Sequence, residues 1–209
     1  MKFEIGIPTL NRVDLLYPSL RMYATKDFQS HIHIIDNGND QFKNKELPNN
    51  VSIINMENNI GVAASWNMLC NRIFKVADYA LILNDDIYLG RNQLQIEALL
   101  PKDNKPFFLK ATPDWCAFII SKSMYQEIGA FDEVFYPAYY EDKSYEYRMK
   151  LKGYKAMKNP LLNPFVYKSS QTLEKEPSII DSARNNRKIY VDMWGGEPTK
   201  EKFTKPYNK

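Results

Sequence analysis

Cysteine and histidine are scarce in this chain, which has two of each among its 209 residues. Cys70 and Cys116 belong to no CxxC motif and have no histidine near them in the sequence, so we expect neither a zinc site nor a disulfide framework. This cysteine usage fits a reducing compartment, and we expect a cytoplasmic protein. His31 and His33 alternate with isoleucines in a strand-like segment, so we expect them on one face of that strand and not as metal ligands.

The chain also lacks a long apolar run and a strong charge of either sign. No stretch approaches the roughly 18 apolar residues that a membrane span requires, and the first residues enter a strand-like segment without a basic and apolar leader. We therefore expect no membrane span and no secretion. The 28 basic and 25 acidic side chains leave a net charge of +3, which is too small to indicate a nucleic-acid partner. The length and the 44% of hydrophobic residues are typical of one soluble globular domain.

Strand-like and helix-like segments alternate along the first half of the chain. This alternation predicts an α/β fold with a mainly parallel central sheet flanked by helices. The second half is more mixed, with helices that end at Gly129 and Gly153. The strands that we expect are residues 3–7, 31–35, 51–54, 79–83 and 116–121, and the helices are about 12–24, 61–77, 122–128, 141–152 and 178–193.

An acidic pair, Asp85-Asp86, comes directly after the buried-strand pattern of residues 79–83. Open α/β sheets bind ligands at the carboxyl ends of their strands, so we expect both carboxylates at such a site. Their oxygen atoms suit Mg²⁺ or Mn²⁺, whose coordination shell is usually completed by substrate phosphates and water. The alternative is a solvated turn, because Asn84 and the two aspartates also favour turns.

Polar residues follow two other predicted strands. Thr9 and Arg12 come after the first strand, and Asp36-Asn37 ends the second. Because the carboxyl ends of parallel strands share one edge, we expect these groups to line one crevice with the acidic pair. A helix that begins after Gly61 would direct its backbone N–H groups toward an anion there. Each motif alone is also a common turn.

Several short motifs occur in a fixed order along the chain: Ile7-Pro8-Thr9-Leu10-Asn11-Arg12, Ile35-Asp36-Asn37-Gly38, Asn59-x-Gly61-x₅-Asn67, Leu83-Asn84-Asp85-Asp86, Gly129-Ala130-Phe131-Asp132-Glu133, and Tyr140-Glu141-Asp142 with Arg148 and Gly153-Tyr154. Together they resemble the GT-A glycosyltransferases of the family-2 type over roughly residues 3 to 170. They also resemble the small glycosyltransferase domains of large DNA viruses that infect algae, which would place a viral protein in the host cytoplasm. The resemblance implies one Rossmann-like GT-A domain over residues 1–195. Its nucleotide-sugar half would cover about 1–100 and its acceptor half about 101–195, before a tail or linker to a further domain at 196–209.

The same resemblance implies a site for a UDP-sugar donor, with glucose or a deoxyhexose such as rhamnose, and Mn²⁺ or Mg²⁺ as cofactor. Thr9 and Asp36 match positions that contact uracil and ribose. Asp85 matches the position that holds the ribose or the sugar, and Asp86 matches the metal ligand. The lesser donor-binding candidates are Arg12, Asn37 and Asn67. A cation on the diphosphate would stabilise the negative charge of the departing nucleotide.

The resemblance further implies inverting transfer to a carbohydrate acceptor, such as the glycan of a glycoprotein or a polysaccharide. Asp142 matches the general base that takes the proton of the acceptor hydroxyl. Asp114 and Trp115 fall in the region that binds the acceptor in the family. As alternatives, Glu141 and Asp142 would cap the helix that follows them, and Trp115 would belong to the core.

One departure from the family pattern is the missing late histidine, since none follows His33. Lys168 lies in the equivalent segment and would neutralise the diphosphate as a point charge, which would weaken the metal dependence.

Three other functions stay open. A sugar nucleotidyltransferase would need a glycine-rich phosphate loop, but Gly6 is the only glycine in the first strand and turn. A metal nuclease would gain little attraction to a phosphate backbone from a net charge of +3. A non-catalytic module that binds a sugar or a nucleotide sugar would need neither the metal acids nor a base, and the chain has candidates for both.

Overall fold

The computed structural model describes residues 2–103, 105–112, 115–167 and 171–209 of the chain. Within these residues, seven strands form the main sheet in the order β3-β2-β1-β4-β7-β6-β8, and β5 pairs with β9 in a small second sheet. The strands are β1 (Phe3–Thr9), β2 (Ile32–Asp36), β3 (Val51–Asn55), β4 (Tyr79–Leu83), β5 (Ile87–Tyr88), β6 (Phe108–Lys110), β7 (Ala117–Ser121), β8 (Met157–Lys158) and β9 (Val166–Tyr167).

The sheet is mixed but mostly parallel, as the sequence predicted. β1 pairs in parallel with β2 and β4, and β2 with β3, whereas β7 is antiparallel to β4 and to β6. Every residue of β4 and β7 is buried, because helices or loops cover both faces of these strands. The order of the strands along the chain reverses between β1 and β4, and open α/β sheets form their ligand crevice at such a point.

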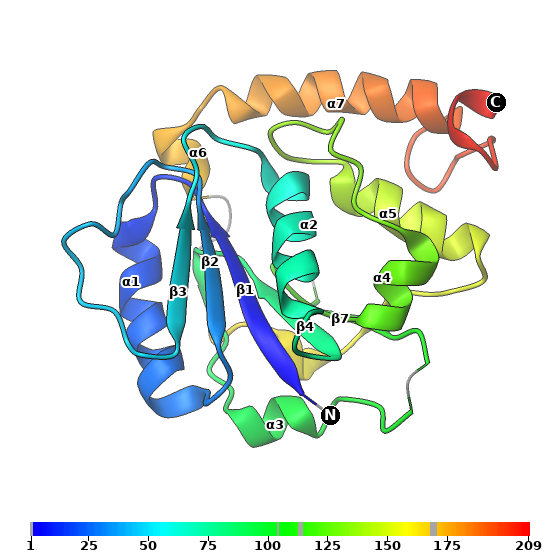
Figure 1. The fold of residues 1–209 in the computed structure, drawn as a ribbon. Coiled ribbons are helices and arrows are strands. Elements are labelled where there is room, and N and C mark those ends of the chain that lie inside the picture. Colours follow the sequence, from blue (N-terminus) through cyan, green and yellow to red (C-terminus); the bar gives the residue numbers. More distant parts are fainter. Residues whose placement is uncertain (1, 104, 113–114, 168–170) are drawn as a thin grey trace.

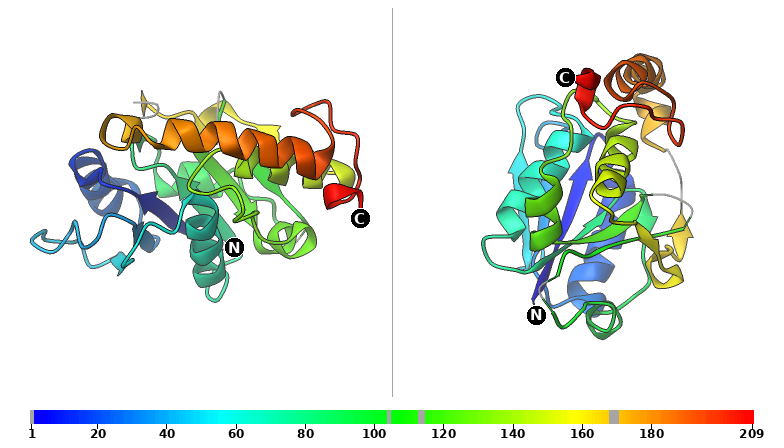
Figure 2. Two further views of the ribbon diagram at one scale, coloured as in Figure 1. Left: turned by 90° about the horizontal axis from the view of Figure 1, so that it is seen from above. Right: turned by 90° about the vertical axis from the view of Figure 1, so that its right-hand side faces the viewer.

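Helices cover both faces of the sheet (Figures 1 and 2). α1 packs on one face, and α2, α4 and α5 pack on the other. The helices and helical turns are α1 (Val13–Met22), η1 (Tyr23–Asp27), α2 (Val62–Ile73), α3 (Gln93–Glu97), α4 (Lys122–Ile128), α5 (Glu141–Leu151), η2 (Pro160–Leu162), α6 (Thr172–Lys175), α7 (Ile179–Trp194) and η3 (Pro206–Asn208).

Close packing at Gly6 fixes the distance between α2 and β1. A Cβ atom on Gly6 would lie 2.8 Å from Ile82 Cδ1 and 3.1 Å from Leu69 Cβ, so a larger residue would push the helix away from the sheet. The glycine therefore lets the start of α2 reach the carboxyl end of β1.

Some element boundaries differ from the expectation at polar residues. β1 continues to Thr9 and β2 to Asp36, because the parallel register pairs these two residues. α2 ends at Ile73 instead of near residue 77, since the chain leaves the helix there to turn back into β4. The expected limits of β4 and α4 are confirmed.

α7 crosses the top of the molecule above α2 and α5 in Figure 1, where α6 lies above the ends of β1 and β3, and α7 lies across other helices in the view from above in Figure 2. The residues after Gly195, which we expected to be a tail or linker, fold back on α5 and α7. Tyr147 Oη donates to the carbonyl of Phe203 at 2.8 Å, and Tyr190 Oη donates to Glu201 at 2.6 Å.

In the described parts of the chain, none of the helices combines the length and the apolar character that a bilayer crossing needs.

Candidate active site

A cavity of about 290 Å³ lies at the carboxyl ends of β1 and β4. Its walls come from these two strand ends, the start of α2, the residue before β7, the loop that leads into α5, and α6 with the start of α7. The residues predicted for the site that line the cavity are Thr9, Asn37, Asp85, Asp86, Trp115 and Asp142. Arg12, Asp36 and Asn67 were also predicted for the site but do not line this cavity.

Asp85 joins the ends of the two central strands. It is 7% exposed, and its Oδ2 accepts a hydrogen bond of 3.4 Å from the backbone N–H of Leu10. Burial, and after it the charge of Asp86, raise the pKa of Asp85 to about 7, although the Thr9 hydroxyl and the Leu10 N–H oppose the shift. A positive charge close to Asp85 would therefore convert a carboxyl that is only partly ionised at neutral pH into a carboxylate.

Asp86 is also 7% exposed, and its Oδ2 accepts a long hydrogen bond of 3.4 Å from Gln171 N. No group of three or more histidine, cysteine, aspartate or glutamate side chains within the described ranges is arranged to hold a metal ion by itself. Mg²⁺ or Mn²⁺ would therefore need phosphate oxygens and water in its shell, which is the usual arrangement at nucleotide sites. Two adjacent buried acids fit such an ion, because its charge would offset the repulsion that contributes to the raised pKa of Asp85.

The end of β2 is organised by its own side chains. Asp36 is fully buried, and its carboxylate accepts hydrogen bonds from Gln41 N at 2.8 Å and from Gln41 Nε2 at 2.5 Å. Asn37 Oδ1 accepts from Ile60 N at 3.0 Å, and Asn37 Nδ2 donates to Ser65 Oγ at 3.0 Å. Asp36 thus shapes the turn that follows it, and Asn37 ties this turn to the start of α2 at the cavity wall.

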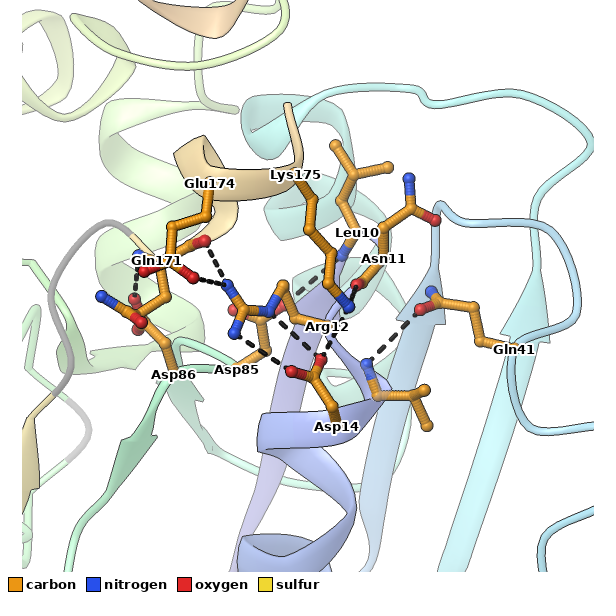
Figure 3. Close-up of polar contacts among 11 residues, drawn as sticks. Leu10, Asn11, Arg12, Asp14, Gln41, Asp85, Asp86, Gln171, Glu174 and Lys175 are labelled. Carbon is orange, nitrogen blue, oxygen red and sulfur yellow. Dashed lines mark hydrogen bonds and ion pairs between the residues drawn. The ribbon is translucent and has the colours of Figure 1, made fainter. Parts of the chain in front are cut away.

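Arg12 connects the end of β1 to α6, as Figure 3 shows. Its guanidinium lies 3.1 Å from Asp14 and 3.4 Å from Glu174, and it donates a hydrogen bond to the carbonyl of Gln171. Its side chain is 4% exposed. In this structure Arg12 therefore stabilises the position of α6, which forms part of the cavity wall, and does not itself line the cavity.

Further contacts join the same two segments, and Figure 3 shows those of Lys175. Lys175 Nζ donates to the carbonyl of Asn11 at 2.8 Å and lies 3.1 Å from Asp14, and Asn11 Nδ2 donates to Glu176 at 2.6 Å. We call residues 11–14 and 171–176 together the α6 latch. It holds α6 over the ends of β1 and β4.

Asn67 has all its hydrogen-bonding groups engaged away from the cavity. Its Nδ2 donates to the carbonyl of Phe131 at 3.0 Å and to Glu133 at 2.8 Å, and its Oδ1 accepts from Phe131 N at 2.8 Å and from Tyr125 Oη at 3.2 Å. The side chain therefore fastens the loop that leads toward α5 onto α2.

We expect Asn67→Ala to lower the free energy of unfolding by about 2–4 kcal/mol, because the backbone N–H and C=O of Phe131 would lose their partner inside the protein. Urea denaturation followed by circular dichroism measures this loss. Asn71→Ala is the matched control, since Asn71 lies exposed on the same helix, and it should change stability by no more than about 0.5 kcal/mol. Equal effects of the two substitutions would contradict the fastening role of Asn67.

The first residues of α5 bring two more acids to the cavity. Glu141 is 5% exposed, and burial, followed by the charge of Asp142, raises its pKa well above the ordinary value. The Asp142 side chain is 20% exposed and lies 3.2 Å from Lys143 Nζ. The two acids follow Tyr139 and Tyr140, whose φ angles of 76° and 79° are in the left-handed region. Such backbone strain is common at functional sites.

Asn186 on α7 holds this strained loop in place and was not predicted. It is 2% exposed, and its Nδ2 donates to the carbonyls of Ala138 at 2.9 Å and of Tyr139 at 3.2 Å. The sequence contained a signal for it, because Asn186 continues the spacing of three and four residues set by the buried positions Tyr190 and Met193.

Trp115 lines the cavity but is mostly core. It is 6% exposed, stacks on Trp66 with 6.1 Å between ring centroids, and donates from Nε1 to Glu146 at 3.4 Å. Asp114, the other predicted acceptor-binding residue, and Lys168 lie outside the described residues.

No family model matches the sequence, and a comparison with curated protein sequences finds no match. Solved structures, however, are similar. GalNAc-T7 with UDP, GalNAc and Mn²⁺ matches with a TM-score of 0.62 and 12% identity over 95% of this chain and 49% of that one. The mannosyltransferase PcManGT from Pyrobaculum calidifontis, in complex with GDP-Man and Mn²⁺, gives 0.61 and 10% identity over 90% of this chain and 64% of that one. A cytidylyltransferase from Leptospira borgpetersenii gives 0.51 and 14% identity over 77% of this chain and 76% of that one.

These similarities concern the fold, because the sequence identities are between 10% and 14%. The chain spans 64% and 49% of the lengths of the two glycosyltransferases. Over that span its seven-stranded, mostly parallel sheet and flanking helices form an α/β fold that matches the GT-A glycosyltransferases.

Proposed function

We propose that this chain is an inverting glycosyltransferase that moves a hexose from a UDP-sugar to a hydroxyl of a carbohydrate acceptor, such as a glycan of a glycoprotein or a polysaccharide. One observation carries the proposal: Asp85 and Asp86 from the first half and Glu141 and Asp142 from the second half line the same cavity. A transferase needs an acidic site for the nucleotide and a separate base for the acceptor. The GT-A-like fold supports the same conclusion.

The roles of the residues follow from their positions around the cavity. Mn²⁺ or Mg²⁺, held by Asp86 with Asp85 beside it, would supply the positive charge that stabilises the departing diphosphate. Thr9 and Asn37 line the donor side, and Asp36 shapes the turn next to them. Asp142 takes the proton of the acceptor hydroxyl as this oxygen attacks the anomeric carbon from the face opposite the leaving group.

We expect UDP to bind more tightly than GDP, and more tightly with Mn²⁺ than without it. The turn held by Asp36 gives the base subsite a fixed shape, and the acids at the end of β4 need a cation before they can face a diphosphate. Titration calorimetry with both nucleotides, each with Mn²⁺ and with EDTA, measures the two differences. Equal affinity for UDP and GDP would contradict the base-selecting role of the Asp36 turn. Equal affinity for UDP with Mn²⁺ and with EDTA would contradict the role of the cation in binding.

A donor screen tests the transfer itself. The protein is incubated with Mn²⁺, simple glycosides as acceptors and a panel of UDP-, GDP- and dTDP-sugars, and the release of free nucleotide is measured. Tight binding of a nucleotide sugar without any release would instead favour the non-catalytic binding module.

The similarity to a cytidylyltransferase, with a TM-score of 0.51, makes a nucleotidyltransferase the second candidate. Release of pyrophosphate from UTP or CTP in the presence of a sugar 1-phosphate would identify that reaction. A glycosyltransferase should release none.

A further inference from the structure

Three residues that line the cavity carry a buried polar atom for which the described residues offer no hydrogen-bond partner of good geometry: Thr9 Oγ1, Trp66 Nε1 and Glu141 Oε2. The Thr9 hydroxyl acts on the carboxyl of Asp85, which leaves Trp66 Nε1 and Glu141 Oε2. Trp66 is 3% exposed and Glu141 is 5% exposed. A buried polar group without a partner destabilises the folded protein, and native structures contain few of them. Two such atoms on one cavity are therefore candidates for contacts with a ligand.

The aromatic core fixes the direction of the Trp66 N–H group. The indole ring meets Phe118 and Phe131 edge to face, with centroids 5.0 Å and 5.1 Å away, and stacks on Trp115 at 6.1 Å. A ring that is packed on three sides cannot turn its N–H toward another acceptor without disrupting these contacts. The indole N–H of this lining residue thus keeps a fixed direction.

Glu141 is fixed in a similar way by the backbone. It begins α5 directly after Tyr139 and Tyr140, and Asn186 holds the carbonyl of Tyr139. Burial raises the pKa of its carboxyl, so this group can donate a proton in a hydrogen bond as well as accept one. Asp142, the next residue, is the more exposed of the two acids.

The two atoms together select the kind of group that can satisfy both. The indole N–H only donates, so its partner must be an acceptor, whereas the carboxyl oxygen accepts or, when protonated, donates. A hydroxyl meets both requirements because it carries one donor and two acceptor lone pairs. An alkyl group would satisfy neither atom.

We propose that Trp66 and Glu141 form a subsite that recognises a hydroxyl of a sugar ring. This inference rests on the proposed function and deepens it, because it names residues that select the sugar. The hydroxyl belongs either to the glycosyl group of the donor or to the acceptor ring. A site built to bond a hydroxyl discriminates strongly against an analogue without it, since the buried polar groups then stay unpaired.

The test uses Trp66→Phe, which keeps most of the aromatic volume but removes the N–H, and Glu141→Met, which keeps the length but removes the carboxyl. Calorimetry with Mn²⁺ measures the affinity of each variant for UDP, for UDP-glucose, UDP-galactose and UDP-rhamnose, and for methyl β-glucoside in the presence of UDP. We expect each variant to bind one class of sugar ligand about tenfold more weakly, the loss of one hydrogen bond, and to bind UDP with unchanged affinity. Glu141→Gln should keep most of the affinity, because an amide also donates and accepts.

Analogues of UDP-glucose or of methyl β-glucoside that lack one hydroxyl each locate the contact. The analogue that lacks the recognised hydroxyl should bind about tenfold more weakly to the wild type and show no additional loss in Trp66→Phe, because both changes remove the same bond.

Two further variants control for packing and stability. Trp194→Phe removes a buried indole N–H that donates to Ser144 Oγ at 3.0 Å, so it should lower the melting temperature and leave every affinity unchanged. Tyr145→Phe removes a buried hydroxyl that has no partner among the described residues but does not line the cavity, and it should also leave binding unchanged. Glu141→Met should raise the melting temperature, because an apolar side chain replaces a buried acid.

Weaker binding of the UDP-sugar alone supports recognition of the donor, and weaker binding of methyl β-glucoside alone supports recognition of the acceptor. Wild-type affinity of both variants for every sugar ligand would overturn the proposal, and so would an equal loss for UDP itself. A wild type that gains no affinity from any sugar would also overturn it. If the wild type does prefer a sugar ligand but the donor screen detects no nucleotide release, the proposed transfer fails while the subsite remains.

Discussion

Replacing Asp142 by asparagine should lower the rate of sugar transfer by roughly 10²–10⁴-fold and leave the affinity for the donor nearly unchanged. Asparagine has the shape of aspartate and retains most of its hydrogen bonding at the start of α5, but it cannot take a proton from the acceptor hydroxyl. Asp142 lines the cavity with a side chain that is 20% exposed, so an acceptor can reach it. Steady-state kinetics with a fixed acceptor gives kcat and KM, and calorimetry with the UDP-sugar gives the donor affinity.

Glu141→Gln is the matched control for this experiment, since it makes the same chemical change in the neighbouring acid. Glu141 is more deeply buried, and its raised pKa favours the neutral form, so we expect this variant to keep most of the transfer rate. Loss of transfer in Glu141→Gln with normal transfer in Asp142→Asn would assign the base to Glu141. Normal transfer in both variants would contradict an inverting mechanism at this site.

The second large effect is expected for Asp86→Ala, which should abolish the enhancement of UDP binding by Mn²⁺ and lower transfer by roughly 10²–10³-fold. The carboxylate follows β4 beside another buried acid, so its removal also relieves repulsion between the two charges. We therefore expect little change in stability, with a melting temperature within about 4 °C of the wild type. Calorimetry with and without Mn²⁺ and thermal unfolding of the same samples measure both properties.

Asp78→Ala provides the control from the same strand, because Asp78 directly precedes β4 at the end away from the cavity. It should leave the Mn²⁺ effect intact. If Asp86→Ala instead loses more than about 3 kcal/mol of stability, Asp86 has a structural role in the turn. That result would contradict the proposal that Asp86 holds a cation.

The position of Asp85 and Asp86 at an edge of the sheet could be predicted from the sequence, because it depends on the hydrophobic pattern of the residues directly before them. Five buried residues in a row, Tyr79–Leu83, specify a central strand, and the residues after it must emerge at its carboxyl end. The parallel register then places Thr9 beside Asp36, so motifs that are far apart in the sequence meet at one edge. Strand pattern and chain order were sufficient for this part of the site.

The roles of Asp36, Asn67 and Arg12 could not be predicted in the same way, since a motif identifies a residue but not its partner. Asp36 binds the side chain of Gln41, and Asn67 binds the backbone of Phe131. Both partners depend on loop conformations that hydrophobic periodicity does not encode. Arg12 meets a carbonyl 159 positions later in the chain.

The two-residue strands that follow β4 were missed for a related reason. β5, β8 and β9 contain two residues each, too few to show an alternating pattern. The orientation of the Trp66 N–H depends on the aromatic rings packed around it, so it could be seen only in the structure.

The α6 latch also determines when the cavity can exist during protein synthesis. Its contacts join residues 11–14 to residues 171–176, so one partner leaves the ribosome long before the other. The early strands can start to form the sheet while the acids at the end of β4 still face solvent on the growing chain. The growing chain therefore acquires the sheet edge with Asp85 and Asp86 first and the closed cavity last, and a chain that stops before α6 keeps this edge but never forms the wall over it.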